Sequence, residues 1–111
     1  MAIVSFDEAL RSDPYHVATY QGVAWLLATC PESRYRDPQK ALEAARRAQR
    51  FGAENDPVIL DTLAAALANA GDYELAIPYA QQAARLATFP LRGEIEARIA
   101  LYQQGKPFRA E

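Results

Sequence analysis

The sequence predicts an all-α protein built from antiparallel helix pairs, and two features of it favour this fold class. Alanine is abundant whereas valine and isoleucine are few, which favours helix over strand. Apolar residues also recur at intervals of three and four, which places them on one face of a helix. The 111 residues are 50% hydrophobic and 23% charged, a balance typical of a globular domain rather than a disordered chain.

Helix starts are marked by aspartate followed by proline. An aspartate at the N-cap accepts hydrogen bonds from free backbone N–H groups, and proline is tolerated at the first helical position. Three such pairs occur, Asp13-Pro14, Asp37-Pro38 and Asp56-Pro57. At Gly71-Asp72 the glycine ends one helix and the aspartate caps the next.

Apolar stripes place the first three helices. Residues 2–12 carry a stripe on one face, formed by Ile3, Phe6, Ala9 and Leu10. Residues 15–29 are apolar on more than one side, around a main stripe of Tyr20, Val23, Ala24 and Leu27. After a polar turn, residues 38–51 carry small apolar residues on one face and arginines on the other, Arg46, Arg47 and Arg50.

Three more helices are expected over residues 57–70, 73–87 and 91–104. The first two carry apolar residues at helical intervals, and Gly105 and Pro107 end the third. In this last helix we expect Ile95, Ile99 and Tyr102 to cover the preceding helix, while the charged residues face water, namely Glu94, Glu96 and Arg98. Residues 105–111 either fold back, with Phe108 on the core, or fray.

The helical segments repeat an internal pattern. Segments that begin at Ala2, Ala41 and Ala76 each have an aliphatic residue next and alanine again seven residues later. The helices between them also align, with Tyr20, Val23, Ala24 and Leu27 matching Leu60, Leu63, Ala64 and Leu67. Small residues at fixed positions allow two helices to approach closely while large ones fill the grooves.

This pattern resembles the tetratricopeptide repeat, a helix-turn-helix unit of roughly 34 residues. Residues 57–90 fit it best, and Ala24 to Pro31 (Ala-Trp-Leu-Leu-Ala-Thr-Cys-Pro) resembles a bacterial variety of the repeat. The resemblance implies a right-handed α-solenoid of about six helices in one domain. Its expected parts are half a repeat (1–14), a repeat with an enlarged turn (15–55), a second repeat (56–90), a capping helix (91–104) and a tail (105–111).

The resemblance also implies a binding groove for a protein or peptide, because inner helices of such repeats line a concave surface. The corresponding residues here are Gln21, Trp25, Thr29, Asp61, Ala65 and Asn69. Trp25 is either a binding anchor in this groove or a core residue packed under the enlarged turn or against Tyr35. Relatives that clamp a C-terminal carboxylate do so with lysine, arginine and asparagine on the inner helices. The corresponding positions here hold Gln21, Trp25, Asp61 and Ala65, so that type of receptor is not expected.

Two further functions remain open. The outer side of the first helix leaves Ile3, Phe6 and Leu10 without a visible partner, and such apolar patches often pair two copies into a homodimer. The other alternative is that the chain is a regulatory segment of a larger multidomain protein.

Other classes of function are disfavoured. The single histidine, His16, has no identifiable nucleophile beside it, and no cluster has metal-ligand spacing, so we expect neither catalysis nor a metal or cofactor. A net charge of -2 argues against nucleic acid, and no apolar run is long enough to span a membrane. The lone cysteine, Cys30, makes no intrachain disulfide, and we expect a cytoplasmic location.

Overall fold

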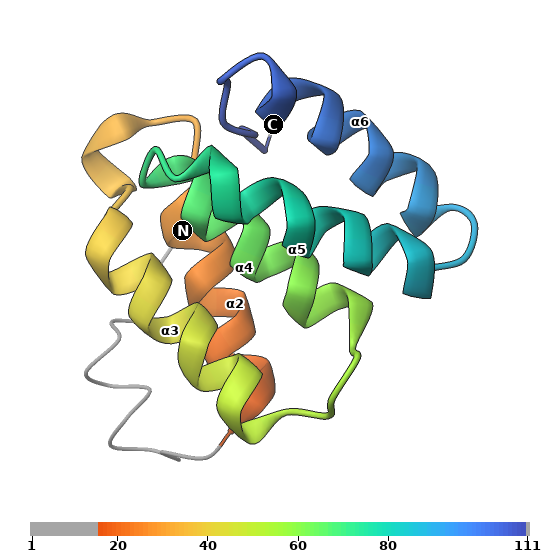
Figure 1. The fold of residues 1–111 in the computed structure, drawn as a ribbon. Coiled ribbons are helices and arrows are strands. Elements are labelled where there is room, and N and C mark those ends of the chain that lie inside the picture. The colour runs from red at the N-terminus through yellow and green to blue at the C-terminus, as the bar shows by residue number, and fades with distance from the viewer. Residues whose placement is uncertain (1–15, 111) are drawn as a thin grey trace.

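The computed structural model describes residues 16–110, which form an all-α structure (Figure 1). Within this range there are five α-helices, one short 3₁₀ helix and no strand. The elements in chain order are α2 (Val17–Thr29), η1 (Ser33–Tyr35), α3 (Pro38–Phe51), α4 (Pro57–Asn69), α5 (Tyr73–Leu86) and α6 (Leu91–Gln103).

The all-α class is therefore confirmed, and five of the six expected helices lie where the apolar stripes place them. Their ends agree with the expected ends to within two residues. The enlarged turn between α2 and α3 contains η1, which the sequence did not predict. The first expected helix, and with it Ile3, Phe6 and Leu10, lies outside the described residues.

Aspartate caps explain why three of the helices begin where they do. The carboxylate of Asp37 accepts a hydrogen bond from the Lys40 amide at 3.1 Å. The carboxylate of Asp56 accepts a hydrogen bond from the Val58 amide at 2.9 Å, and that of Asp72 accepts one from the Leu75 amide at 3.3 Å. Each bond satisfies one N–H that has no acceptor within the first turn of a helix. The first expected cap, Asp13, lies outside the described residues.

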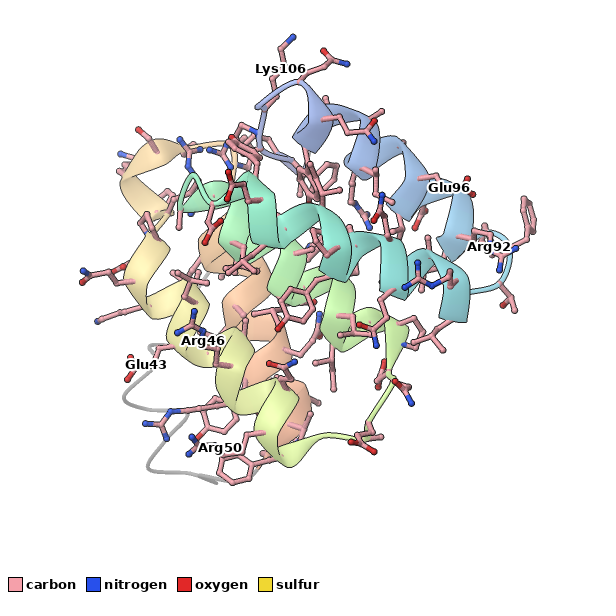
Figure 2. The ribbon with its side chains drawn as sticks, in the orientation of Figure 1. Glu43, Arg46, Arg50, Arg92, Glu96 and Lys106 are labelled. Atoms are coloured by element: carbon pink, nitrogen blue, oxygen red, sulfur yellow. The ribbon has the colours of Figure 1, made fainter. Side chains whose placement is uncertain are left out.

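The core is centred on α4, because this helix packs against α2, α3 and α5. Every residue from Ile59 to Ala68 is buried. Alanines at the contact faces of the neighbouring helices are also fully buried, among them Ala24, Ala41 and Ala76. Such small residues bring the helix backbones close, as the repeat pattern predicts. Charged side chains on the outer faces of α3 and α6 point away from this core (Figure 2), including Arg46, Arg50 and Glu96.

α6 packs against α5, and the chain then reverses. The reversal centres on Gly105, whose φ of 69° is a left-handed conformation that glycine adopts without strain. The Gly105 amide donates to the Tyr102 carbonyl, and the Lys106 amide donates to the Leu101 carbonyl, both at 3.0 Å. This is a common way for a helix to end at glycine. Residues 104–110, which we call the return segment, lead from this turn back to α2, where the Ala110 amide donates to the Thr29 carbonyl at 2.8 Å. Of the two alternatives for the tail, the structure shows the folded-back one.

Candidate binding surface

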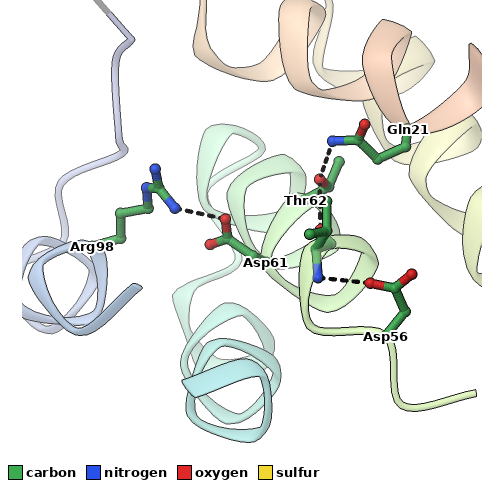
Figure 3. Close-up of polar contacts among 6 residues, drawn as sticks. Gln21, Asp56, Asp61, Thr62 and Arg98 are labelled. Carbon is green, nitrogen blue, oxygen red and sulfur yellow. Dashed lines mark hydrogen bonds and ion pairs between the residues drawn. The ribbon is translucent and has the colours of Figure 1, made fainter. Parts of the chain in front are cut away.

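A buried ion pair joins two helices that are distant in sequence. Nη1 of Arg98 on α6 lies 2.6 Å from Oδ2 of Asp61 on α4. The two residues are only 9% and 4% exposed. Figure 3 shows the guanidinium of Arg98 pointing across from α6 at the carboxylate. The pair fixes the position of α6 relative to α4, since removing either partner would leave an uncompensated buried charge.

The burial of Arg98 contradicts the expectation that this side chain faces water. Arg98 follows Ile95 by three residues and precedes Tyr102 by four, so it lies on the same buried face of α6 as these two. The charge of Arg98 favours solvent exposure, whereas its position in the helical repeat indicates the buried face of α6. The other two charged residues, Glu94 and Glu96, are exposed as expected.

The protonation of Asp61 is governed by its burial. Burial raises the pKa of this carboxyl from the ordinary value of 3.8 to about 6, and the negative charge of Glu94 adds to the rise. The positive charge of Arg98 lowers the pKa, but by less than burial raises it. Oδ1 of Asp61 has no hydrogen-bond partner among the described residues. The loss of its hydration on burial is therefore not offset by a hydrogen bond.

We therefore predict that the ionisation of Asp61 makes the fold less stable as pH rises. The folded pKa of about 6 lies above the ordinary 3.8, so the folded state binds the proton more tightly than the unfolded state between these values. The stabilisation is complete below about pH 4 and is lost as pH rises through about 6, with a total on the order of 1–3 kcal/mol. Urea denaturation of the wild type and of Asp61→Asn at a series of pH values measures it. The difference in unfolding free energy between the two proteins should change in this window, and a constant difference would contradict the prediction.

Arg98 is also part of an aromatic cluster that brings the return segment onto α2. Its Cζ atom lies 4.8 Å from the ring centre of Trp25 and 4.5 Å from that of Phe108. The two ring centres are 5.6 Å apart, with their planes inclined by 39°. These distances fit cation–π and aromatic pair contacts. Trp25 is thus half-buried, with Phe108 and Arg98 against its ring. Tyr35, which the core interpretation named as a partner of Trp25, lies under the guanidinium of Arg34.

The return segment also supplies hydrogen bonds to the end of α2. The last carbonyls of a helix have no N–H donor within that helix, so their hydrogen bonds must come from elsewhere. Those of Leu26 and Leu27 accept from the amides of Cys30 and Asp37. The carbonyl of Ala28 accepts from Nη1 of Arg109 at 3.1 Å, and that of Thr29 accepts from the Ala110 amide. The return segment therefore completes the C-terminal end of α2.

Beside this cluster lies a pocket of about 190 Å³ between α2, α4 and α6. Its walls combine polar and apolar side chains, namely Gln21, Trp25, Val58, Asp61, Thr62, Leu91 and Arg98. Nε2 of Gln21 donates to the Thr62 hydroxyl at 2.9 Å, and this hydroxyl donates to the Val58 carbonyl at 2.8 Å (Figure 3). Nε of Arg98 has no hydrogen-bond partner among the described residues. We call the face formed by α2, α4, α6 and this pocket the inner surface.

The structure brings together only part of the groove that the sequence predicts. Gln21, Trp25 and Asp61 line the pocket. Thr29 and Ala65 are 1% and 2% exposed and do not present a surface. The Thr29 hydroxyl donates to the Trp25 carbonyl within α2, which turns it away from any ligand.

Asn69, the last of the predicted groove residues, is partly buried, and its Nδ2 atom has no hydrogen-bond partner among the described residues. The groove predicted from the sequence lacks three residues that line the pocket, Val58, Leu91 and Arg98. For Arg98 the signal was its place on the apolar face of α6, whereas Val58 and Leu91 lie in the first turns of their helices, where the apolar stripe gives no such indication.

Tyr102 gives a simple test of how polar groups are satisfied next to this surface. The residue is 1% exposed, and its hydroxyl has no hydrogen-bond partner among the described residues. Burial and the nearby negative charge of Asp61 raise its pKa above the ordinary value, so it stays neutral. We expect Tyr102→Phe to raise the free energy of unfolding by about 1 kcal/mol, because it removes an unsatisfied buried group. Urea denaturation checks this, and a loss of more than about 1 kcal/mol would mean that the hydroxyl makes a bond.

Comparisons of the chain with protein-family models, with curated proteins and with solved structures find no match. None of the described helices is both long and apolar enough to cross a membrane. Over residues 16–110, no three histidine, cysteine, aspartate or glutamate side chains are grouped so that they would hold a metal ion.

Proposed function

We propose that the chain is a tetratricopeptide-like, right-handed solenoid module that binds a protein or peptide partner through its inner surface. The solenoid arrangement is supported by the packing of consecutive helices, α2 on α3, α4 on α5 and α5 on α6, and by the contact between α2 and α4. It is also supported by the buried alanines at the positions that repeat along the sequence.

The observation that carries the binding function is the pocket between α2, α4 and α6. It combines apolar walls from Trp25 and Val58 with a few polar groups that converge on one place, which is typical of recognition sites. The carboxylate of Asp61 and the guanidinium of Arg98 are bound to each other and hold the helices in place. We therefore assign the pocket to recognition and assign it no catalytic step.

Peptide selection followed by matched substitutions tests this function. Peptides are selected from a random library on the immobilised wild-type protein, and their affinities are measured by calorimetry. Val58, which is 43% exposed at the pocket, is replaced by glutamate. Leu75 on α5, which is 48% exposed and does not line the pocket, is replaced by glutamate as the control.

We expect Val58→Glu to weaken binding by about tenfold or more, because it places a charge in an apolar contact, and Leu75→Glu to have an effect of less than about twofold. Equal effects of the two substitutions, or a selection that yields no binding peptide, would overturn the proposed function.

A further inference from the structure

The return segment lies on the inner surface in the way that a bound peptide would. Residues 106–110 form no helix or strand, yet their side chains and backbone contact α2 and α6. We propose that residues 107–110 are an intramolecular ligand of the inner surface, and that the partner displaces them with an extended segment in which a basic residue follows an aromatic one. This inference rests on the proposed function and adds to it the chemistry of the partner and a built-in competitor.

The aromatic preference follows from the cluster around Arg98. The guanidinium lies against both the Trp25 and the Phe108 rings, at 4.8 and 4.5 Å from their centres. A flat ring at the position of Phe108 contacts a π face and a cation at once, and an aliphatic side chain would lose both interactions. Arg98 is held in this position by its ion pair with Asp61, so the aromatic slot, formed by Trp25 and Arg98, is a rigid part of the fold.

The preference for a basic residue follows from the end of α2. The carbonyls at the C-terminal end of a helix form the negative end of its dipole and attract cations. Nη1 of Arg109 reaches the Ala28 carbonyl at 3.1 Å, and the next residue donates its amide to the Thr29 carbonyl. An aromatic residue, a basic residue and a free backbone N–H in succession therefore match the aromatic slot and the two carbonyls of Ala28 and Thr29.

The part of the return segment that contacts the inner surface remains accessible to solvent and to a competing partner. All of its residues from Pro107 to Ala110 are partly exposed. Burial lowers the pKa of Arg109, and the neighbouring positive charge of Arg36 lowers it further, so the surroundings of Arg109 disfavour its charge. Arg36 itself donates to the carbonyls of Cys30 and Pro31. A partner with the same sequence pattern is not constrained by the Gly105 turn. It is able to fill the aromatic slot and to donate hydrogen bonds to the carbonyls of Ala28 and Thr29.

Binding of the segment in trans tests this inference. The probe is a fluorescein-labelled, amidated peptide with the sequence of residues 104–111, Gln-Gly-Lys-Pro-Phe-Arg-Ala-Glu. Its binding is followed by fluorescence anisotropy with the wild-type chain and with the double variant Phe108→Ala/Arg109→Ala. An attached segment competes at an effective concentration in the millimolar range, so we expect the double variant to bind the peptide at least about tenfold more tightly than the wild type.

Two controls make the result specific. A peptide in which alanine replaces the phenylalanine should bind neither protein measurably. Adding Trp25→Ala to the double variant should abolish binding, because it removes one wall of the aromatic slot. Circular dichroism shows whether the double variant keeps its helices. If it does not, Phe108→Leu is used in its place, because leucine keeps an apolar side chain at this position but has no ring.

Equal affinity of the peptide for the wild type and the variant, or no binding to either, would overturn the inference. If library peptides lose affinity in Val58→Glu but lack the aromatic–basic pair and bind both proteins equally, the proposed function stands and this inference fails. A wild-type dimer that requires Phe108 would identify the occupant as the segment of a second copy and would also overturn the inference.

Discussion

Replacing Arg98 by alanine is expected to lower the free energy of unfolding by about 3–5 kcal/mol at pH 7, because the substitution leaves the Asp61 carboxylate buried without its counter-charge. The two groups are 2.6 Å apart and are 11% and 6% exposed at the side chain, so water does not replace the lost partner. Trp25 and Phe108 also lose the cation between them. This is a large part of the stability of a typical domain.

Urea denaturation followed by circular dichroism measures this effect, with Arg85→Ala as the control. Arg85 is exposed on α5, and its removal should change the free energy by less than about 0.5 kcal/mol. The cost of Arg98→Ala should be smaller at pH 4 than at pH 7, because the pKa of Asp61 rises further when Arg98 is absent and the carboxyl protonates. A cost that does not depend on pH would contradict the role given to the ion pair.

Tyr20→Ala is expected to be comparably destabilising, by about 3–5 kcal/mol, because the ring is completely buried. The side chain projects from α2 into the core, and the guanidinium of Arg47 on α3 lies 5.9 Å from its ring centre. Alanine would leave a cavity at the junction of the helices, which the already close-packed alanines around it cannot fill.

The free energies of unfolding of Tyr20→Ala and Tyr35→Ala are measured by thermal and urea denaturation. The comparison shows whether the loss depends on burial of the ring or only on the loss of an aromatic side chain. Tyr35 is 39% exposed in η1, so its replacement should cost less than about 1 kcal/mol. Similar losses for the two variants would contradict the placement of Tyr20 in the core.

The helices could be predicted from the sequence because their signals are local. An aspartate before proline marks a helix start wherever it occurs, and the apolar stripes of α3 and α4 depend only on residues within one helix. The resemblance to the tetratricopeptide repeat, rather than these local signals, placed Gln21, Trp25 and Asp61 in one groove, and the structure shows the three residues lining a pocket.

The inner surface itself could not be predicted in full, because it depends on contacts between distant parts of the chain. Asp61 was expected in an open groove, whereas it is buried by Arg98 from a helix that follows much later in the sequence. The charge of Arg98 favours exposure to water, but a buried charge is tolerated when an opposite charge faces it. Asp61 is that opposite charge, and the sequence does not show that the two residues meet. For Phe108 the sequence left folding back and fraying open, since the choice depends on Trp25 and Arg98 meeting it.

The emission of Trp25 tests the central claim, that the return segment lies on the inner surface, most directly. Trp25 is the only tryptophan in the chain, so its fluorescence reports on this site alone. The spectrum and the quenching by iodide are compared for the wild type, Phe108→Ala and Phe89→Ala, the last being a control at a phenylalanine that is 92% exposed. The structure predicts emission at longer wavelength and stronger quenching in Phe108→Ala, with no change in Phe89→Ala. Identical spectra and quenching in all three proteins would contradict the contact between Trp25 and Phe108 and, with it, the placement of the return segment on the inner surface.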